Sequence, residues 1–261
     1  MNESLAVLSV VEGITEFLPI SSTAHLIIAS KLFSLELTDA YIKFYLLFIQ
    51  LGALGAGVLL FAKRIFFDKN LFFNICISFL PSATVGFVLY KSFKKLLEGN
   101  MLILALALAL GGVIFIYLEK IFMRRDGGDL HDFGKSTISK TDAFLVGLAQ
   151  AVAIVPGVSR SGITIVAGIL RGIKKEVIIE YTFMLALPTL GAAVLYDAYR
   201  SRAMLATIDS YGELASGFML AFAVAGITLF LLKKYLSKIS LTYFGWYRIL
   251  LALIVFVYFV I

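Results

Sequence analysis

Two short polar segments interrupt otherwise apolar stretches of this chain, and they hold residue types that can transfer a phosphoryl group. The first segment, 12–25, contains Glu12, Glu16, Ser22 and His25. Glu12 and Glu16 are four residues apart, so they share one face of a helix. Two carboxylates held together among apolar residues repel each other unless a proton, a metal ion or an arginine neutralises them. The segment therefore predicts an acidic pair that requires a cationic partner or a proton.

Hydroxyl residues and a histidine follow the proline of this first segment. Ser22 and His25 are three residues apart, so they share a face if a helix resumes after Pro19. A serine hydroxyl attacks at neutral pH when a base lies beside it, and Glu16 is a candidate for that base. A purely structural interpretation is also open, in which Ser21 or Ser22 caps the helix and His25 is packed inside. For Ser21 alone, the cap is the better interpretation.

The second polar segment, 156–164, has an arginine at its centre. An arginine in the middle of a bilayer costs about 2.5–3.5 kcal/mol on insertion scales, which makes Arg160 a candidate for function. Its fork of donors fits phosphate oxygens bidentately, and a helix resuming here offers free N–H groups to an anion. We predict an anion site in which Arg160 is surrounded by the hydroxyls of Ser159, Ser161 and Thr164. The alternative is a buried ion pair with an acidic residue of the first segment and no catalytic role.

The composition of the chain places these segments in a membrane. Of the 261 residues, 61% are hydrophobic and 15% are charged, and the mean hydropathy is +0.97. Soluble domains contain about 45–50% apolar and about 25% charged residues, so an ordinary soluble domain is excluded. The only cysteine, Cys76, excludes a disulfide framework and a thiolate metal site. No nucleic-acid module is recognisable, so we expect no nucleic acid among the partners.

Six apolar stretches are long enough to cross a hydrocarbon core, which needs about 20 residues of helix. They lie at 41–62, 71–90, 101–123, 177–197, 213–232 and 244–261. Two further apolar regions, 3–33 and 141–171, are interrupted near Pro19 and Pro156, and each half is too short to span. Proline removes a backbone donor and disfavours helix in the preceding residue. The predicted fold is an all-α polytopic membrane protein with six transmembrane helices and two re-entrant helical hairpins.

The prolines also mark an internal repeat. In each half, the hairpin proline is followed by a Leu-Pro pair inside a later span, at Pro81 and at Pro188. This order predicts an N-terminal repeat at 1–123 and a C-terminal repeat at 141–261, joined by a polar linker at 124–140. The linker contains His131, which we interpret as a solvated loop residue.

The distribution of Lys and Arg predicts the orientation in the membrane. One side of the six spans carries 15 of these residues, with Arg248 counted among them, and the other side carries seven, with Arg160 set aside. Positive charge stays inside, so the richer side is cytoplasmic and both termini lie outside. Because three spans separate the hairpins, they enter from opposite sides, as in an inverted-topology repeat whose tips meet near the middle of the membrane.

The two segments resemble the signature motifs of the undecaprenyl-diphosphate phosphatase family, which is linked to bacitracin resistance. The motifs are Glu-Gly-Ile-Thr-Glu-Phe-Leu-Pro-Ile-Ser-Ser-Thr-Ala-His at 12–25 and Pro-Gly-Val-Ser-Arg-Ser-Gly-Ile-Thr at 156–164. Length and number of spans agree over essentially the whole chain. The resemblance implies a hydrolase of the cell inner membrane, with a cleft open to the periplasmic side, that converts undecaprenyl diphosphate to the monophosphate and orthophosphate. It thereby implies lipid-carrier recycling for peptidoglycan synthesis, and antibiotic resistance.

The resemblance also implies roles for individual residues. The catalytic residues are Glu16, Ser22, His25 and Arg160. The substrate-binding residues are Glu12, Thr23, Ser159, Ser161, Gly162 and Thr164. A divalent cation, Mg²⁺ or Ca²⁺, would be held by the two glutamates. The partners are a polyprenyl diphosphate and membrane lipids; the oligomeric state is open, and a homodimer is one form considered.

Alternatives remain for the nucleophile and for the activity. We favour attack by Ser22 with Glu16 as base, while attack by His25 with Ser22 as a phosphate ligand is the competing assignment. A transporter or lipid flippase is the strongest rival activity, because transporters also use inverted repeats with broken helices. A carrier needs Arg160 but has no need for a carboxylate base beside a hydroxyl and an imidazole. A two-histidine membrane phosphatase is a poor fit, since no histidine follows Arg160.

Overall fold

The computed structural model describes residues 2–97, 100–126, 134–200, 202 and 211–261. Among these residues, six long helices contain an apolar stretch long enough to cross a membrane. They are α3 (Ala40–Phe67), α4 (Lys69–Leu97), α5 (Met101–Asp126), α8 (Lys175–Arg200), α10 (Tyr211–Tyr235) and α11 (Leu241–Phe259). Within the described residues no strand is formed, and a single bridge joins Lys135 to Ile173. The predicted all-α fold with six spans is confirmed.

Four short helices form two pairs. The first pair is α1 (Glu3–Thr15) and α2 (Ser22–Leu32), and the second is α6 (Lys140–Gln150) and α7 (Arg160–Leu170), with a short 3₁₀ helix, η1 (Ala151–Ile154), directly after α6. Pro19 and Pro156 both fall in the non-helical connections, so the predicted breaks are confirmed. The members of each pair pack against each other. Each of the four helices has 11 to 13 residues, fewer than the roughly 20 that a span needs.

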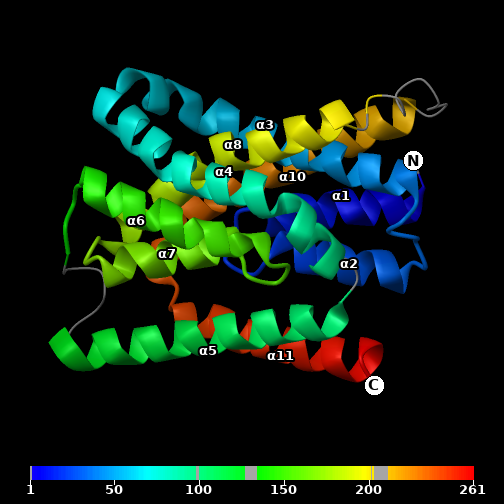
Figure 1. Ribbon diagram of the computed structural model, residues 1–261. Coiled ribbons are helices and arrows are strands. Elements are labelled where there is room, and N and C mark those ends of the chain that lie inside the picture. The colour runs from blue at the N-terminus through cyan, green and yellow to red at the C-terminus, as the bar shows by residue number, and fades with distance from the viewer. Residues whose placement is uncertain (1, 98–99, 127–133, 201, 203–210) are drawn as a thin grey trace.

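The two helix pairs enter the bundle from opposite ends. Both termini lie at one end, and the α1–α2 pair opens toward that end, whereas the α6–α7 pair opens toward the end where α5 leads into α6 (Figure 1). The connections of the two pairs meet inside the bundle, where the hydroxyl of Ser161 donates to the carbonyl of Leu18 over 2.8 Å. This arrangement is the one that two re-entrant hairpins would require.

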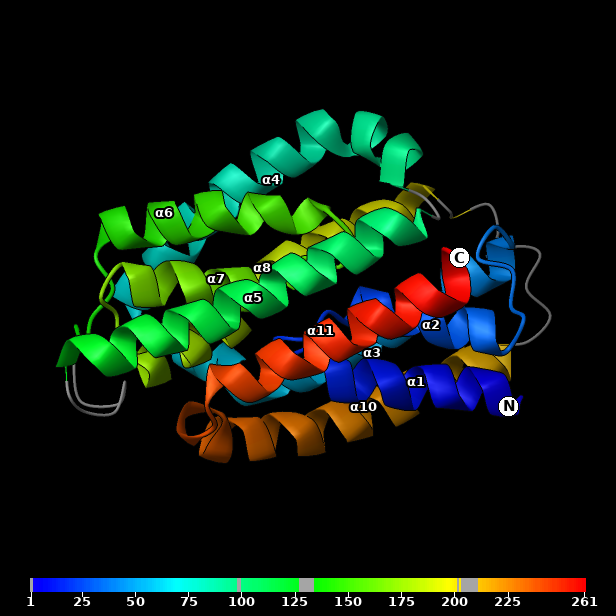
Figure 2. The same cartoon turned by 90° about the horizontal axis from the view of Figure 1, so that it is seen from below.

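The helix contacts are consistent with the predicted inverted repeat. If α1, α3, α4 and α5 of the first half correspond to α6, α8, α10 and α11 of the second, the contact of α1 with α10 is repeated by the contact of α6 with α4. The corresponding helices α3 and α8 pack against each other, and so do α5 and α11. Helices α5 and α11 lie side by side in both views and form a layer of their own (Figures 1 and 2). The largest cluster of buried apolar residues surrounds the first hairpin tip, where Phe17 meets the ring of Phe183 edge-on at 5.8 Å. The tips are therefore held in a packed core.

A buried carboxylate closes the base of the second pair. Asp142, in the first turn of α6, accepts hydrogen bonds from Arg171 Nε at 2.9 Å and from Lys135 Nζ at 3.2 Å. Burial alone would raise the pKa of Asp142, but hydrogen bonds from Ser139, Arg171 and Lys135 outweigh it and lower the pKa to about 2. Since Arg171 directly follows α7, Asp142 joins the two ends of the pair.

The predicted linker, 124–140, is described in part. Helix α5 continues through Asp126, and α6 begins at Lys140. His131 and the rest of 127–133 lie outside the described residues.

Candidate active site

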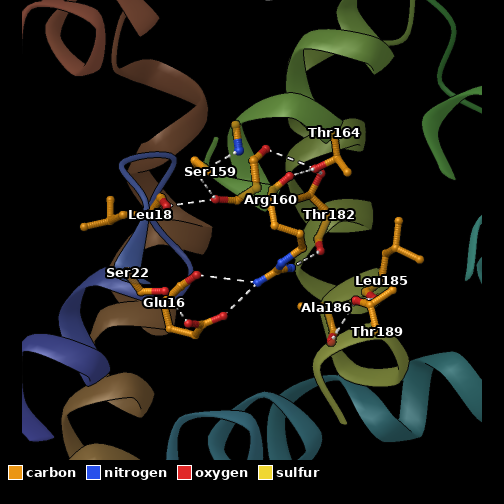
Figure 3. Close-up of polar contacts among 12 residues, drawn as sticks. Glu16, Leu18, Ser22, Ser159, Arg160, Thr164, Thr182, Leu185, Ala186 and Thr189 are labelled. Atoms are coloured by element: carbon orange, nitrogen blue, oxygen red, sulfur yellow. Dashed lines mark hydrogen bonds and ion pairs between the residues drawn. The ribbon is translucent and has the colours of Figure 1, made fainter. Parts of the chain in front are cut away.

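The two pairs of short helices bring an arginine and a carboxylate together across 144 residues of sequence. Arg160 begins α7, and its Nη2 donates to Glu16 Oε1 over 3.1 Å (Figure 3). Its Nη1 donates to the carbonyl of Thr182 on α8 over 3.3 Å. Both side chains of the ion pair are buried, with 12% of the arginine and 4% of the glutamate exposed. The predicted proximity of Arg160 to the acidic residues of the first segment is confirmed.

The second oxygen of the same carboxylate receives a serine hydroxyl. Ser22 Oγ donates to Glu16 Oε2 over 2.6 Å (Figure 3). Such a length is typical of a hydroxyl bound to a charged carboxylate. Ser22 is half-buried and its neighbour Thr23 is exposed, both in the first turn of α2. Glu16 thus contacts a cation and a nucleophile-type hydroxyl at once, the geometry that base activation of Ser22 needs.

Glu12 lies on α1, one turn before Glu16, and is fully buried. Within the described part of the chain, no N–H or hydroxyl donor reaches either of its carboxyl oxygens. Its carboxyl group lies beside that of Glu16 and interacts with it and with the charge of Arg160. Because an isolated buried carboxylate is costly, Glu12 needs a proton or a nearby cation.

The glutamate pair fits a hard divalent cation. Among the described residues, no group of three or more His, Cys, Asp or Glu side chains is gathered at one point. Mg²⁺ and Ca²⁺ nevertheless bind oxygen ligands, and Mg²⁺ in particular is held by one or two carboxylates together with substrate phosphates and water. Such an ion would bind the carboxylates of Glu12 and Glu16, although both oxygens of Glu16 already contact Arg160 and Ser22.

The hydroxyls of the second segment shape the start of α7. Ser159 is the N-cap residue, and its Oγ accepts from Gly162 N over 3.1 Å and lies 3.1 Å from Ser161 Oγ. Thr164 is fully buried and donates to the carbonyl of Arg160, with Thr182 Oγ1 at 2.9 Å. All three hydroxyls are engaged within the protein, so their predicted contacts with phosphate stay predictions.

Gly162 is needed for a close approach of helices. A Cβ atom added there would lie 3.0 Å from Phe115 Cζ on α5. The glycine therefore allows α5 to lie against the first turn of α7.

Ser21 does not cap α2 through its side chain, so that prediction is wrong. The residue stands at the N-cap position, but its φ of 75° and ψ of 92° are far from the extended backbone that aims a cap hydroxyl at the helix. Its hydroxyl makes no capping hydrogen bond. Its carbonyl instead lies 2.7 Å from His25 Nδ1.

Sequence comparison identifies the family. A sequence profile described as "Bacitracin resistance protein BacA" matches residues 5–254. The chain belongs to this family. A protein of Campylobacter fetus subsp. fetus is 41% identical over 258 residues, covering 97% of this chain and 96% of the relative. Proteins of Sulfurihydrogenibium sp. (40% identical, 97% of each chain) and Aquifex aeolicus (39%, 95% of this chain and 94% of the relative) are similar. All three are named undecaprenyl-diphosphatase.

His25 of this BacA-family chain is bound to α11 as well as to the hairpin. Its Nε2 lies 2.7 Å from Tyr247 OH, and the two rings stack with centroids 5.7 Å apart. A carbonyl only accepts, so Nδ1 carries the proton toward Ser21 O, and in the neutral ring Nε2 then accepts from the tyrosine. Both ring nitrogens are therefore occupied by partners other than Ser22 and Glu16. The sequence did not indicate Tyr247, and the catalytic role of His25 stays a prediction.

Arg248 was assigned to the cytoplasmic charges, and the structure shows that this is wrong. The residue is 2% exposed and donates to carbonyls of both hairpin tips, Pro19 O at 3.3 Å and Gly157 O at 2.8 Å. It also donates to Leu108 O and Ala107 O on α5. It follows the start of α11 by seven residues, which places it about 10 Å along the helix. The charge count becomes 14 against seven, and the predicted orientation is unchanged.

A glycine on α5 makes room for the side chain of Arg248. A side chain at Gly111 of α5 would overlap the guanidinium of Arg248. Glycines occur in both apolar spans, at Gly111-Gly112 and at Gly245. They could have been used to predict that the two helices cross closely and leave room for a large side chain.

Proposed function

We propose that this chain is an integral-membrane phosphatase that hydrolyses undecaprenyl diphosphate to undecaprenyl phosphate and orthophosphate. The observation that carries this proposal is the contact of Glu16 with both Arg160 and Ser22, contributed by two hairpins that enter from opposite ends. Relatives that match nearly the whole chain are named undecaprenyl-diphosphatase. The substrate pairs a charged head with a long apolar tail, which suits a buried cationic site between membrane helices.

Arg160 neutralises the terminal phosphate in this proposal. Phosphoryl transfer spreads charge over three equatorial oxygens, and catalysis depends mainly on positioning and on balancing that charge. The Nε of Arg160 is buried without a hydrogen-bond partner among the described residues, so the guanidinium has a donor to offer. The positive end of α7, where the residue lies, adds to the attraction for an anion.

Ser22 is the nucleophile that the geometry favours. Its Oγ attacks the terminal phosphorus while its proton passes to Glu16, and the bond from that phosphorus to the bridging oxygen breaks. Undecaprenyl phosphate leaves, and water then attacks the phosphoserine to release orthophosphate and restore the hydroxyl. In the competing assignment His25 attacks, which requires its Nε2 to part from Tyr247.

Two further features complete the proposal. Glu12 and Glu16 would hold a Mg²⁺ or Ca²⁺ ion, which supplies positive charge beside the phosphates when bound. The excess of Lys and Arg at the end opposite the termini supports a cell inner-membrane location with the site reached from the periplasmic side. There the enzyme would recycle the lipid carrier for cell-wall synthesis and thereby counter bacitracin.

Release of inorganic phosphate from a C55 lipid diphosphate by the purified protein in detergent tests the function. We expect turnover by the wild-type chain, its loss in Glu16→Gln, and lower turnover with a chelator present. The rival lipid flippase, favoured by the inverted hairpins, would release no phosphate and would move a labelled lipid head group across vesicles. A folded wild-type protein without phosphate release would overturn the proposal.

A further inference from the structure

An apolar groove lies beside the second hairpin. Its volume is about 350 Å³, and it runs between α5 and the segment from η1 to α7. Leu106, Leu110 and Ile114 line it on α5, and Val152 and Val158 line it on the hairpin side.

The α5 wall is a continuous stripe on one helix face. Ile103, Leu106, Leu110 and Ile114 follow each other at spacings of three and four residues, so they lie in one row of about 16 Å. Leu106 is 54% and Leu110 is 63% exposed, so the wall is open at the surface of the bundle. In a membrane-spanning helix this surface faces lipid tails.

The groove reaches the start of α7. Ser159 and Gly162, on either side of Arg160 and Ser161 in the chain, line it together with Arg248. Ser159 precedes Arg160 in the chain, and its Oγ lies 3.1 Å from Ser161 Oγ, which in turn donates to Leu18 O of the first hairpin. The groove therefore reaches the first turn of α7, the turn in which Arg160 lies, although the side chains of Arg160 and Glu16 do not themselves line it.

We propose that this groove holds the isoprene units nearest to the diphosphate of the lipid substrate, an inference that rests on the proposed function. When the diphosphate binds at Arg160, the first isoprene unit, which is bonded to the inner phosphate, lies close to the start of α7. From the start of α7, the aliphatic lining of the groove leads to the surface facing the bilayer. Packing of the first isoprene units along α5 orients the scissile phosphate toward Ser22. The groove thus distinguishes a prenyl diphosphate from other phosphate esters.

Substitutions that fill the groove test this assignment. Leu110→Trp and Ile114→Trp, alone and together, narrow it at residues that touch no catalytic group. The matched control is Val113→Trp, because Val113 is 55% exposed on α5 and does not line the groove. With C15 and C55 diphosphates, the groove variants should raise KM about tenfold while kcat changes by less than about threefold. Unchanged KM in both groove variants, or an equal rise in the control, would overturn the assignment.

Photolabelling separates the substrate tail from bulk lipid. A C15 diphosphate with a diazirine on its first isoprene unit should label peptides of α5 and of the second hairpin. Unlabelled C55 diphosphate should compete, and excess phosphatidylglycerol should not. Equal competition by the phospholipid would make the groove a site for bulk lipid only and overturn the proposal.

The outcomes also separate this inference from the function on which it rests. If the wild-type chain releases phosphate and the groove variants keep the wild-type KM, the assignment of the groove is wrong and the phosphatase function stands. If the wild-type chain releases no phosphate, both the groove assignment and the proposed function are wrong.

Discussion

Arg160 and Arg248 both lie buried where the two hairpins meet, and their partners differ in kind. Arg160 has an acidic partner from the other hairpin and retains an Nε without a hydrogen-bond partner among the described residues. Arg248 donates through Nε, Nη1 and Nη2 to four backbone carbonyls, including one at each hairpin tip. A guanidinium whose three nitrogens all donate to the protein holds the tips in place, whereas one that keeps a nitrogen without a partner beside an exchangeable carboxylate can bind a phosphate.

Of the changes that test this difference between the two arginines and their surroundings, Arg160→Lys should have the largest effect on turnover. A lysine keeps the positive charge but loses the planar fork that contacts Glu16, Thr182 and a phosphate together. We expect kcat/KM for phosphate release to fall roughly 10²–10³-fold, as for the loss of a donor that stabilises a transition state. The melting temperature in detergent serves as the control and should stay within a few degrees of wild type. A variant with near wild-type turnover would remove the distinction between the two arginines.

Arg248→Gln should have the opposite effect, with a large decrease in melting temperature and a small decrease in turnover. Shortening the side chain leaves several buried carbonyls without a donor, each costing about 1–3 kcal/mol. We expect the melting temperature to fall by roughly 5–12 °C, and turnover of the protein that stays folded at low temperature to fall less than tenfold. Thermal melting and phosphate release on the same preparation measure both effects. A stable variant with no turnover would instead assign Arg248 to the reaction itself.

A smaller effect is expected at the contact between the first hairpin and α11. Tyr247→Phe keeps the ring that stacks on His25 and removes the hydroxyl bound to Nε2. Loss of one hydrogen bond of about 1 kcal/mol predicts a several-fold decrease in kcat. Measurement of kcat across pH tests this, with His25→Ala in parallel. An increase in kcat for the phenylalanine variant would favour His25 as the nucleophile, because its attack requires Nε2 to part from Tyr247.

The smallest effect on turnover should come from Asp142→Asn, at the base of the second hairpin and far from both tips. Because the folded pKa of Asp142 is lowered to about 2, its carboxylate contributes stability above the unfolded pKa of about 4, and that contribution is lost as pH falls toward 2. At neutral pH the variant should melt at a lower temperature than wild type. The difference should shrink between about pH 4 and pH 2. A constant difference across that range would show that the charge is not what Asp142 contributes.

Much of the fold follows from local covalent geometry and hydropathy. The breaks at Pro19 and Pro156 were predictable because each of these prolines, which lack a backbone donor, stands in a polar segment; Pro81 and Pro188 stand in long apolar runs and lie inside α4 and α8. The spans were predictable because lipid requires long apolar helices. The pairing of Arg160 with Glu16 was predictable for a different reason. Opposite charges in apolar surroundings require each other, so two segments 144 residues apart could be matched by chemistry alone.

Other features depend on how helices pack and were missed. Arg248 was interpreted as an interfacial charge because it stands near the start of its span. It is buried because α5 and α11 cross closely at Gly112 and Gly245, and Gly111 leaves room for the guanidinium. The left-handed backbone of Ser21 and the bond from His25 to Tyr247 arise from the tight hairpin tip. Such contacts depend on the tertiary arrangement and leave no local periodicity.

The central claim is that the two hairpin tips form one reacting unit around Glu16. A double-mutant cycle tests it most directly, because each hairpin contributes one of the two changes. Rates of phosphate release are measured for wild type, Ser22→Ala, Arg160→Lys and the double variant. Groups that act together show losses that do not add. We predict that the double variant is about as slow as the slower single variant. Rates in which the two losses multiply would show that the hairpins act independently and would contradict a shared site.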